Sequence, residues 1–201
     1  MNIGQDQERI KLIVVDDDPD FLYLIQKTLK KYPEFDVIGS CDNADSAVSM
    51  VCRKLPDIVL MDLDLGNSFS DGIRASREIR IMTDAKVLIL TAIDSPDVIL
   101  KACQEAFASG YIFKGQQPLL AATILELSRG YTAQEYVIAQ SALACLSEAE
   151  LAVFHNLMGK DVQLQSSRKT IQNQTTSILK KLGLENKKDL LHVFQIFRVN
   201  P

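Results

Sequence analysis

Short apolar runs rich in Val and Ile alternate with amphipathic stretches over the first 130 residues of the chain. The runs have the length of buried strands, whereas the stretches between them repeat apolar residues at helical spacing. The predicted strands are 10–15, 35–40, 57–62, 85–90 and 110–114, and the predicted helices are 19–31, 43–54, 71–82, 96–108 and 117–129. Five strand–helix repeats predict an α/β fold, a parallel sheet with helices on both faces.

Beyond residue 130 the alternation ends and the pattern is helical to the end of the chain. Ser147 followed by Glu150 predicts a capping box at the start of one helix. Ser167 as cap and Gly183 as stop predict a second helix between them, and a third is expected at about 187–197. We therefore expect three parts: residues 1–129, a linker helix in 130–145 and a small all-α unit in 146–201.

Composition adds few constraints. The chain has 201 residues, of which 47% are apolar and 24% charged, which is typical of globular proteins. It contains no apolar run near the roughly 18 residues of a membrane span, and its acidic start does not resemble a signal peptide. Its four cysteines are scattered without metal-ligand spacing, so reduced thiols are expected. These features favour a cytoplasmic protein with no membrane contact.

The net charge of −4 is unevenly distributed. Residues 1–130 carry 14 Lys and Arg against 20 Asp and Glu, a net −6, whereas residues 145–201 carry 8 against 5, a net +3. An acidic front and a mildly basic back fit a regulatory domain joined to one that faces a polyanion, although so small an excess could also arise by chance.

Polar side chains follow several of the predicted strands. Asp16 and Asp17 come directly after the first strand, Asp62 ends the third, Thr91 follows the fourth and Lys114 ends the fifth. Parallel sheets bind ligands at the edge where these strand ends meet. Clustered carboxylates repel unless a cation joins them, and Mg²⁺ prefers carboxylate oxygens and water. The sequence therefore predicts a Mg²⁺ site at this edge.

These five strand-end residues, in this order and spacing, resemble the receiver domain of two-component response regulators over roughly residues 9–130. The resemblance implies a flavodoxin-like (βα)5 fold with a five-stranded parallel sheet. It also implies that Asp62 accepts a phosphoryl group from a sensor histidine kinase. The implied metal ligands are Asp16, Asp17, Asp62 and the backbone carbonyl of Asp64.

By the same resemblance, Thr91 and Lys114 would act on the phosphoryl group, and Thr91 with Tyr111 would form a conformational switch. The alternative to the switch is that Tyr111 is an ordinary half-buried strand aromatic. We do not expect an enzyme, because the phosphorylation is chemistry of the domain on itself. An enzyme for a phosphorylated small molecule would share the Mg²⁺ pocket, but the sequence shows no substrate lid or separate base.

The segment after the predicted acceptor departs from the receiver pattern. "DLDLGNSFSDG" lacks the usual Pro and is about two residues longer before Gly72. Asp64 also adds a carboxylate beside the pocket. Neither change removes a required group, so we expect a working acceptor.

The C-terminal part is similar to the LuxR-type helix-turn-helix of NarL/FixJ response regulators, on the motifs "LSEAEL" and "SSRKTIQNQTTSILKKLGLEN". That similarity implies a recognition helix in the DNA major groove and a final helix that provides a dimer seam. It thus implies DNA binding and a homodimer on activation. The implied DNA-contacting residues are Lys169, Thr170, Ile171, Gln172 and Asn173.

The helix-turn-helix is shortened by about six residues, which leaves residues 159–166 between its helices. At about 1.5 Å per residue, eight residues cannot form a loop, a two-turn supporting helix and a tight turn. The supporting helix should be a single turn or absent. Gln172 and Gln174 also replace the family's usual Lys and His. An alternative is therefore a phosphorylation-switched output that acts through protein contacts or dimerisation, without DNA.

Overall fold

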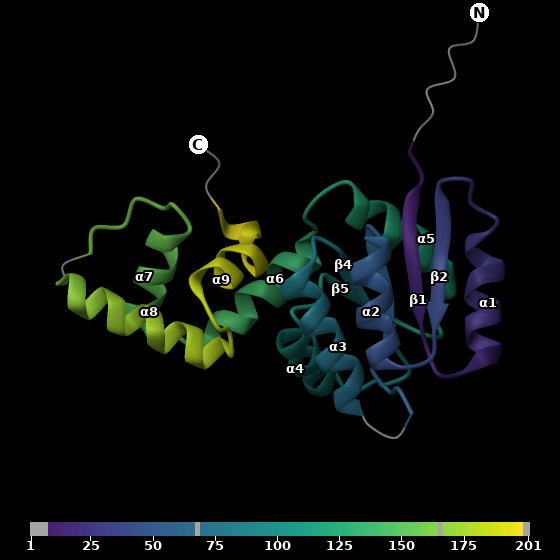
Figure 1. Cartoon of the computed structure of the whole chain (residues 1–201), viewed down its shortest axis with the longest axis horizontal. Coiled ribbons are helices and arrows are strands. Elements are labelled where there is room, and N and C mark those ends of the chain that lie inside the picture. Colours follow the sequence, from purple (N-terminus) through teal and green to yellow (C-terminus); the bar gives the residue numbers. More distant parts are fainter. Residues whose placement is uncertain (1–7, 67–68, 165–166, 199–201) are drawn as a thin grey trace, which may run out of the picture. The chain divides into compact units, whose positions relative to one another are not determined.

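The computed structural model describes residues 8–66, 69–164 and 167–198. The chain divides into two compact units, residues 1–135 and 136–201, so the division lies inside the predicted linker range (Figure 1). In the described part of the chain, each helix is too short or too polar to cross a membrane.

The first unit is built on a five-stranded sheet in the order β2-β1-β3-β4-β5, and all neighbouring strands are parallel. Its strands are β1 (Ile10–Val15), β2 (Phe35–Cys41), β3 (Ile58–Asp62), β4 (Lys86–Thr91) and β5 (Gly110–Phe113). This is the predicted flavodoxin-like topology. The strand bounds differ from the predicted ones by one residue at most, because each strand is an apolar run that ends at polar residues.

Five helices connect the strands, and their ends follow local sequence signals. They are α1 (Pro19–Leu29), α2 (Ala44–Lys54), α3 (Phe69–Met82), α4 (Pro96–Ala106) and α5 (Gln117–Ser128). The Asp18 side chain caps α1 by accepting from the N–H groups of Asp20 and Phe21, and Asn43 caps α2 in the same way. Helix α3 begins two residues earlier than predicted, so the loop before it is shorter than predicted.

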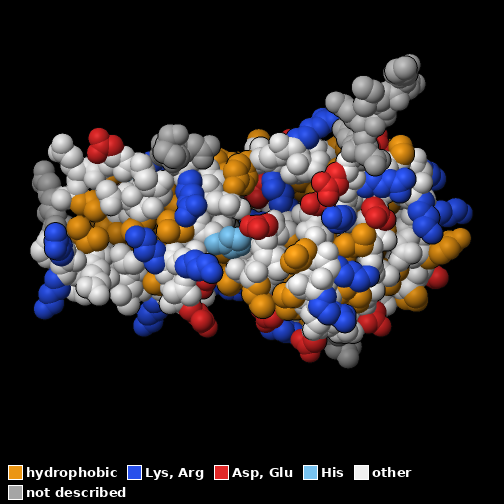
Figure 2. Space-filling view, turned by 45° about the horizontal axis from the view of Figure 1, so that its top comes forward, with side chains coloured by type: hydrophobic (Ala, Val, Ile, Leu, Met, Phe, Trp, Pro, Cys, Tyr) orange, Lys and Arg blue, Asp and Glu red, His pale blue; other side chains and the backbone are white. Residues whose placement is uncertain are grey.

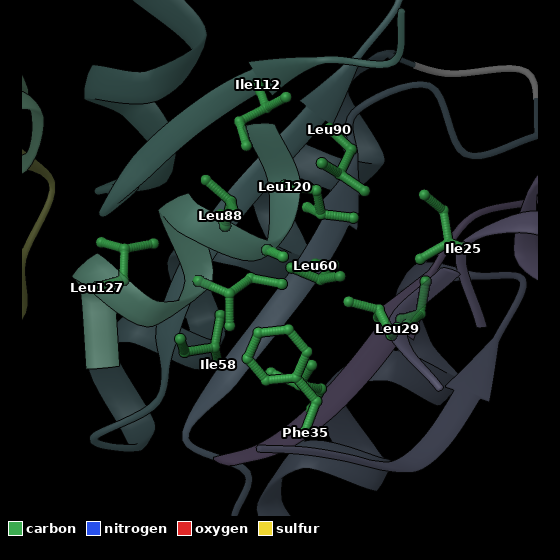
Figure 3. Packing of buried hydrophobic residues seen from close by; sticks show 14 residues of the cluster. Ile25, Leu29, Phe35, Ile58, Leu60, Leu88, Leu90, Ile112, Leu120 and Leu127 are labelled. Carbon is green, nitrogen blue, oxygen red and sulfur yellow. The ribbon is translucent and has the colours of Figure 1, made fainter. Parts of the chain in front are cut away.

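Both faces of the sheet are buried, which explains why the strands show continuous apolar runs rather than alternation. On one face, side chains from α1 and α5 point toward the sheet residues Leu60, Leu88 and Leu90 (Figure 3). On the other face, α2, α3 and α4 cover the alternate strand residues, of which Val59 and Val87 are fully buried. The packing holds the strand ends at fixed spacing, and the polar residues of the candidate site follow those ends.

The second unit is all α-helical. Helix α6 (Ala133–Ala142) begins in the first unit and continues into the second, followed by a 3₁₀ turn η1 (Leu143–Cys145), α7 (Glu148–Leu157), α8 (Arg168–Leu182), α9 (Lys187–Val193) and η2 (Gln195–Phe197). Its core is aromatic: the Phe154 ring centroid lies 5.5 Å from that of Phe194 and 5.8 Å from that of Phe197. The fold class, an α/β unit followed by a small all-α unit, is as predicted.

The helix expected at 187–197 is interrupted, since α9 ends at Val193 and a separate 3₁₀ turn follows. The turn directs Phe194 and Phe197 into the core, where both are buried. Residues 160–164 contain no helix, and residues 165–166 lie outside the described part of the chain. The described residues between α7 and α8 therefore include no supporting helix.

Candidate functional site

Three carboxylates come together at the carboxyl ends of β1 and β3. Val15 and Met61 are paired in the parallel register, so the next residue on each strand, Asp16 and Asp62, reaches the same edge of the sheet. Together with Asp17, each offers one oxygen, and these oxygens all lie within 4.8 Å of one another. Asp16 is 1% exposed and Asp62 is 4% exposed, whereas Asp17 is open to solvent.

Lys114 joins two of these acids. It follows β5, and its Nζ lies 2.7 Å from Asp16 Oδ2 and 2.7 Å from Asp62 Oδ2. The ammonium also lies 4.5 Å from the centroid of the Phe21 ring, in cation–π geometry. Residues from β1, β3 and β5 thus meet at one point, as the sequence predicts for strand-end residues.

Burial dominates the electrostatics of the pocket. Loss of solvation raises the pKa of Asp16 and the pKa of Asp62 above the usual range, and the hydrogen bonds and charge of Lys114 only partly oppose this. Burial also lowers the pKa of Lys114, but the two carboxylates outweigh it and the net shift is upward. The pocket is therefore short of positive charge, with three carboxylates and one ammonium.

This charge balance fits a divalent cation. Asp16, Asp17 and Asp62 form an all-oxygen donor set, which is what Mg²⁺ prefers, and one added divalent ion would neutralise the two negative charges that Lys114 leaves uncompensated. The residues present therefore suit a Mg²⁺ ion.

The segment after β3 closes around the pocket through backbone contacts. The Gly66 N–H donates to Asp17 Oδ2 at 2.9 Å, and the Asp64 N–H lies 3.4 Å from Asp62 Oδ1. Gly66 has a φ of +79°, which a side chain would strain. Gly72 packs so closely that a Cβ there would lie 2.3 Å from the Asp62 carbonyl oxygen. The Asp64 side chain is exposed, and residues 67–68 lie outside the described part.

Thr91 and Tyr111 lie on the neighbouring strands. Thr91 is 1% exposed, and its Oγ1 accepts a hydrogen bond of 3.0 Å from the Ile93 N–H. Its strand pairs with β3 in a register that sets Asp62 opposite Leu90, so Thr91 is one residue further along. Tyr111 is half-buried, and its ring makes an edge contact with Phe113 at 5.9 Å between centroids.

Two residues near the pocket were not predicted from the sequence. Phe21 contacts Lys114, and Gly66 contacts Asp17. The position of Phe21 in the first turn of α1, three residues after Asp18, was the available signal. The Gly66 contact depends on the path of a loop, and loops lack the periodic apolar pattern that predicts helices and strands.

In the second unit, the predicted DNA-contacting residues form the first part of α8. Lys169, Thr170, Gln172 and Asn173 are exposed, and Ile171 is half-buried. Ser167 caps the helix, and its Oγ accepts from the Thr170 N–H at 3.1 Å. Lys and Arg side chains are spread over the face of this unit drawn in Figure 2.

The second half of α8 is held by a polar network centred on Glu150 of α7. Glu150 is 6% exposed, and it accepts hydrogen bonds from Ser177 Oγ at 2.6 Å, from Lys181 Nζ at 2.6 Å and from the Ser147 N–H at 2.7 Å. Hydrogen bonds from Lys181 and Ser177 lower the pKa of Glu150 to about 2. Among the described residues of α8, those that are buried, Ile178 and Leu182, also lie in this half. The polar anchor and the buried residues of α8 therefore all lie toward its C-terminal end.

Comparison with known proteins gives a consistent result. The response regulator receiver domain matches residues 12–126. The transcriptional regulatory protein DegU of Brevibacillus brevis is 30% identical over 115 residues, a match that spans 57% of this chain and about half (48%) of that protein. The putative positive transcription regulator BvgA of Bordetella pertussis is 24% identical over 204 residues, covering 90% of this chain and 94% of BvgA.

A solved structure agrees with these relatives. The two-component response regulator of the LuxR family from Aurantimonas sp. is 31% identical, with a TM-score of 0.58 over 67% of this chain and 96% of that one.

The sheet order and the cluster of acids and lysine at its carboxyl edge define a receiver domain, the regulatory module of two-component signalling. The chain belongs to the response regulator family, within its NarL/FixJ class, whose LuxR-type members regulate transcription.

Proposed function

We propose that this response regulator is phosphorylated on Asp62 by a sensor histidine kinase in the cytoplasm, and that it controls transcription through its second unit. The observation that carries the first part is the position of Lys114, whose Nζ lies 2.7 Å from both Asp16 and Asp62. An ammonium held between two buried acids is suited to receive the negative charge of a phosphoryl group.

The transfer itself needs little covalent help from the protein. An Asp62 carboxylate oxygen attacks the phosphorus of the kinase's phosphohistidine, the O–P bond forms as the P–N bond breaks, and the imidazole keeps the electron pair and takes up a proton. The main obstacle is charge, because two anionic groups approach each other. Lys114 lowers it by pairing with the phosphoryl oxygens, and Thr91, whose hydroxyl can donate, is the second group for those oxygens.

Asp16, Asp17 and Asp62, with the backbone carbonyl of Asp64, are the proposed Mg²⁺ ligands. When bound there, Mg²⁺ supplies further positive charge to the phosphoryl oxygens. The open position of Asp17, with the two buried acids beside it, suits an ion that enters from solvent and retains some of its water.

Phosphorylation would then change the conformation around β4 and β5. In this proposal the Thr91 hydroxyl moves toward the phosphoryl group and Tyr111 turns inward into the space it leaves. Both conformations exist beforehand, and the phosphoryl group changes their populations by binding one better. The outcome is exposure of the second unit or pairing of two chains into a homodimer.

For the output we favour DNA binding through Lys169, Thr170, Ile171, Gln172 and Asn173. The exposure of the first part of α8 supports this, since groove-reading side chains must be free to contact bases. Gln172 and Asn173 have the amide groups that pair with adenine edges, and Lys169 is placed for a phosphate.

One observation favours a second candidate, an output that binds a protein or a second chain without DNA. Residues 160–164 contain no helix, so the described part of the chain lacks the helix that normally crosses the DNA backbone in front of the recognition helix. A helix held mainly at its C-terminal half can also present its exposed half to a protein groove.

The phosphorylation proposal is tested with beryllium fluoride, a mimic of a phosphoryl group on a carboxylate. In the presence of Mg²⁺ it should raise the melting temperature of the wild-type protein and leave Asp62→Asn unchanged. Asp36→Asn is the matched control, because Asp36 is exposed near the amino end of β2, away from the carboxyl edge that holds the pocket, and it should respond like the wild type. An equal response in Asp62→Asn would contradict the proposal.

The two outputs are separated by capturing random genomic DNA fragments with activated protein. DNA binding predicts enriched fragments, and Lys169→Ala should weaken their binding and reduce the slope of log affinity against log salt by about one. Lys180→Ala, an exposed lysine at the other end of α8, is the control and should have the smaller effect. Absence of enrichment above non-specific background would favour the protein-binding output.

A further inference from the structure

The start of α6 packs against the free edge of the receiver sheet. Strand β5 lies at the end of the sheet order, so among the described residues it is paired with a strand on its β4 side and not on the other. On the open side, the Tyr111 N–H donates to Gln134 Oε1 at 3.1 Å, and Gln134 Nε2 donates to the Tyr111 carbonyl at 3.4 Å. One side-chain amide thus makes the pair of hydrogen bonds that a neighbouring strand would make.

The residue before Tyr111 makes this contact possible. A Cβ at Gly110 would lie 2.6 Å from Gln134 Oε1, which is closer than a Cβ atom approaches another heavy atom in proteins. The absence of a side chain at Gly110 therefore lets the amide reach the strand. Gly110 of the strand and Gln134 of the helix thus fit each other, and neither residue is one of the proposed pocket residues.

Glu135, the residue after Gln134, holds the same turn of α6 in place by ion pairs. Glu135 is 2% exposed, and its carboxylate lies 3.0 Å from Lys86 Nζ and 3.7 Å from an Arg80 guanidinium nitrogen. Lys86 also donates to the Gly130 carbonyl, just before α6. A buried carboxylate left without these partners is strongly unfavourable, so the docked position of this turn is specific.

We propose that Gln134 is a positioning residue for Tyr111 that couples the phosphorylation pocket to the linker helix. The proposal rests on the function proposed above, in which Tyr111 changes conformation on phosphorylation. Gln134 holds the backbone of Tyr111 in the resting arrangement, so a movement of Tyr111 weakens the two hydrogen bonds and loosens the start of α6. Helix α6 runs without a break from Ala133 to Ala142, which carries the change out of the receiver.

Coupling of this kind is reciprocal. If phosphorylation loosens the Gln134 contact, then loss of the contact must favour the phosphorylated arrangement of the pocket. Gln134→Ala should therefore bind beryllium fluoride more tightly. A residue with a merely structural role would lower the stability of the protein without tightening the binding of a ligand at the other end of β5.

The experiment is hydrogen–deuterium exchange of the full chain with Mg²⁺, with and without beryllium fluoride. In the wild type, peptides covering 110–113 and 130–137 should exchange faster when the ligand binds. Without beryllium fluoride, these peptides should already exchange about fivefold or more faster in Gln134→Ala than in the wild type. The loss of one net hydrogen bond changes an equilibrium by about that factor. The beryllium fluoride midpoint should fall by a similar factor.

Three further variants keep the test decisive. Gln140→Ala changes an exposed glutamine on the same helix and should behave like the wild type. Gly110→Ala blocks the amide from the strand side and should reproduce Gln134→Ala even if that variant is poorly folded. Gln134→Glu, which can accept from the Tyr111 N–H but cannot donate as a carboxylate, should lie between the wild type and Gln134→Ala.

The outcomes separate this proposal from the one on which it rests. If peptides containing Asp62 and Thr91 respond to beryllium fluoride but 130–137 does not, or if Gln134→Ala matches the wild type in exchange and midpoint, the coupling is wrong and the phosphorylation proposal stands. If no peptide of the wild type responds, both are wrong.

Discussion

Three carboxylates and one ammonium group share the pocket formed by Asp16, Asp17, Asp62 and Lys114. Their convergence could be predicted because each residue directly follows a strand, and parallel strands end at one edge of a sheet. The contacts of Phe21 and Gly66 could not, since they depend on how a helix turn and a loop approach residues distant in sequence. For the same reason no sequence pattern indicates that Gln134 pairs with Tyr111, 23 residues away.

Lys114→Met should slow phosphorylation by a small phosphodonor by about 100-fold, because it removes one preorganised positive charge from the site of transfer. The measurement is the initial rate of phosphoprotein formation at fixed Mg²⁺. Lys101→Met, on the exposed face of α4, is the control and should keep the wild-type rate. A Lys114→Met rate near that of the wild type would show that this ammonium has no part in the transfer.

Mg²⁺ binding should weaken as the pH falls. Burial raises the pKa of Asp16 and of Asp62, so in the metal-free protein the folded state holds these protons more tightly than the unfolded state. Raising the pH through these pKa values therefore lowers the stability of the metal-free fold, and Mg²⁺ restores it by binding the ionised carboxylates.

The measurement for this prediction is the Mg²⁺ midpoint of the thermal shift at several pH values. Asp16→Asn should bind Mg²⁺ less tightly and show a shallower pH dependence, since one of the two competing protons is gone. A midpoint that stays constant as the pH falls would contradict the assignment of these acids as ligands.

At the scale of elements, apolar periodicity predicted all five strands and the helices of the first unit, because buried strands and amphipathic helices must show it. It was less informative in the second unit. The pattern "NKKDLLHVFQIF" predicted one helix, but α9 ends at Val193 and a 3₁₀ turn follows, so that Phe194 and Phe197 both pack on Phe154. Tertiary packing of large rings decided this turn, which local spacing does not encode.

The attachment of α8 to α7 should depend on pH through Glu150. Its pKa of about 2 lies below the usual value of 4.5, so its contribution to stability is fully present above about pH 4.5 and is lost as the pH falls toward 2. Glu150→Gln should lower the free energy of unfolding of the second unit by about 1 kcal/mol or more at neutral pH.

The measurement is the rate of backbone amide hydrogen exchange in α8, and Glu148→Gln on the exposed side of α7 is the control. The wild type should approach the Glu150→Gln variant as the pH is lowered from 4.5 toward 2. If the difference between the two proteins stayed the same across this range, the ionised Glu150 would not be what holds α8.

At the scale of the whole molecule, the chain joins a receiver domain to a shortened helical unit through a helix that belongs partly to each. The family could be predicted from the strand-end residues and is confirmed by the match to residues 12–126. DNA binding remains a prediction, because the motif retains an exposed recognition helix while the described residues between α7 and α8 form no supporting helix. Regulation by phosphorylation is the claim on which every later step depends.

The most direct measurement of that claim is mass spectrometry of the protein after incubation with Mg²⁺ and a small phosphodonor such as acetyl phosphate. The account predicts the addition of one phosphoryl group, mapped to the peptide that contains Asp62, removed by hydroxylamine as an acyl phosphate must be, and absent from Asp62→Asn. A phosphoryl group on another residue, or equal phosphorylation of Asp62→Asn, would contradict it.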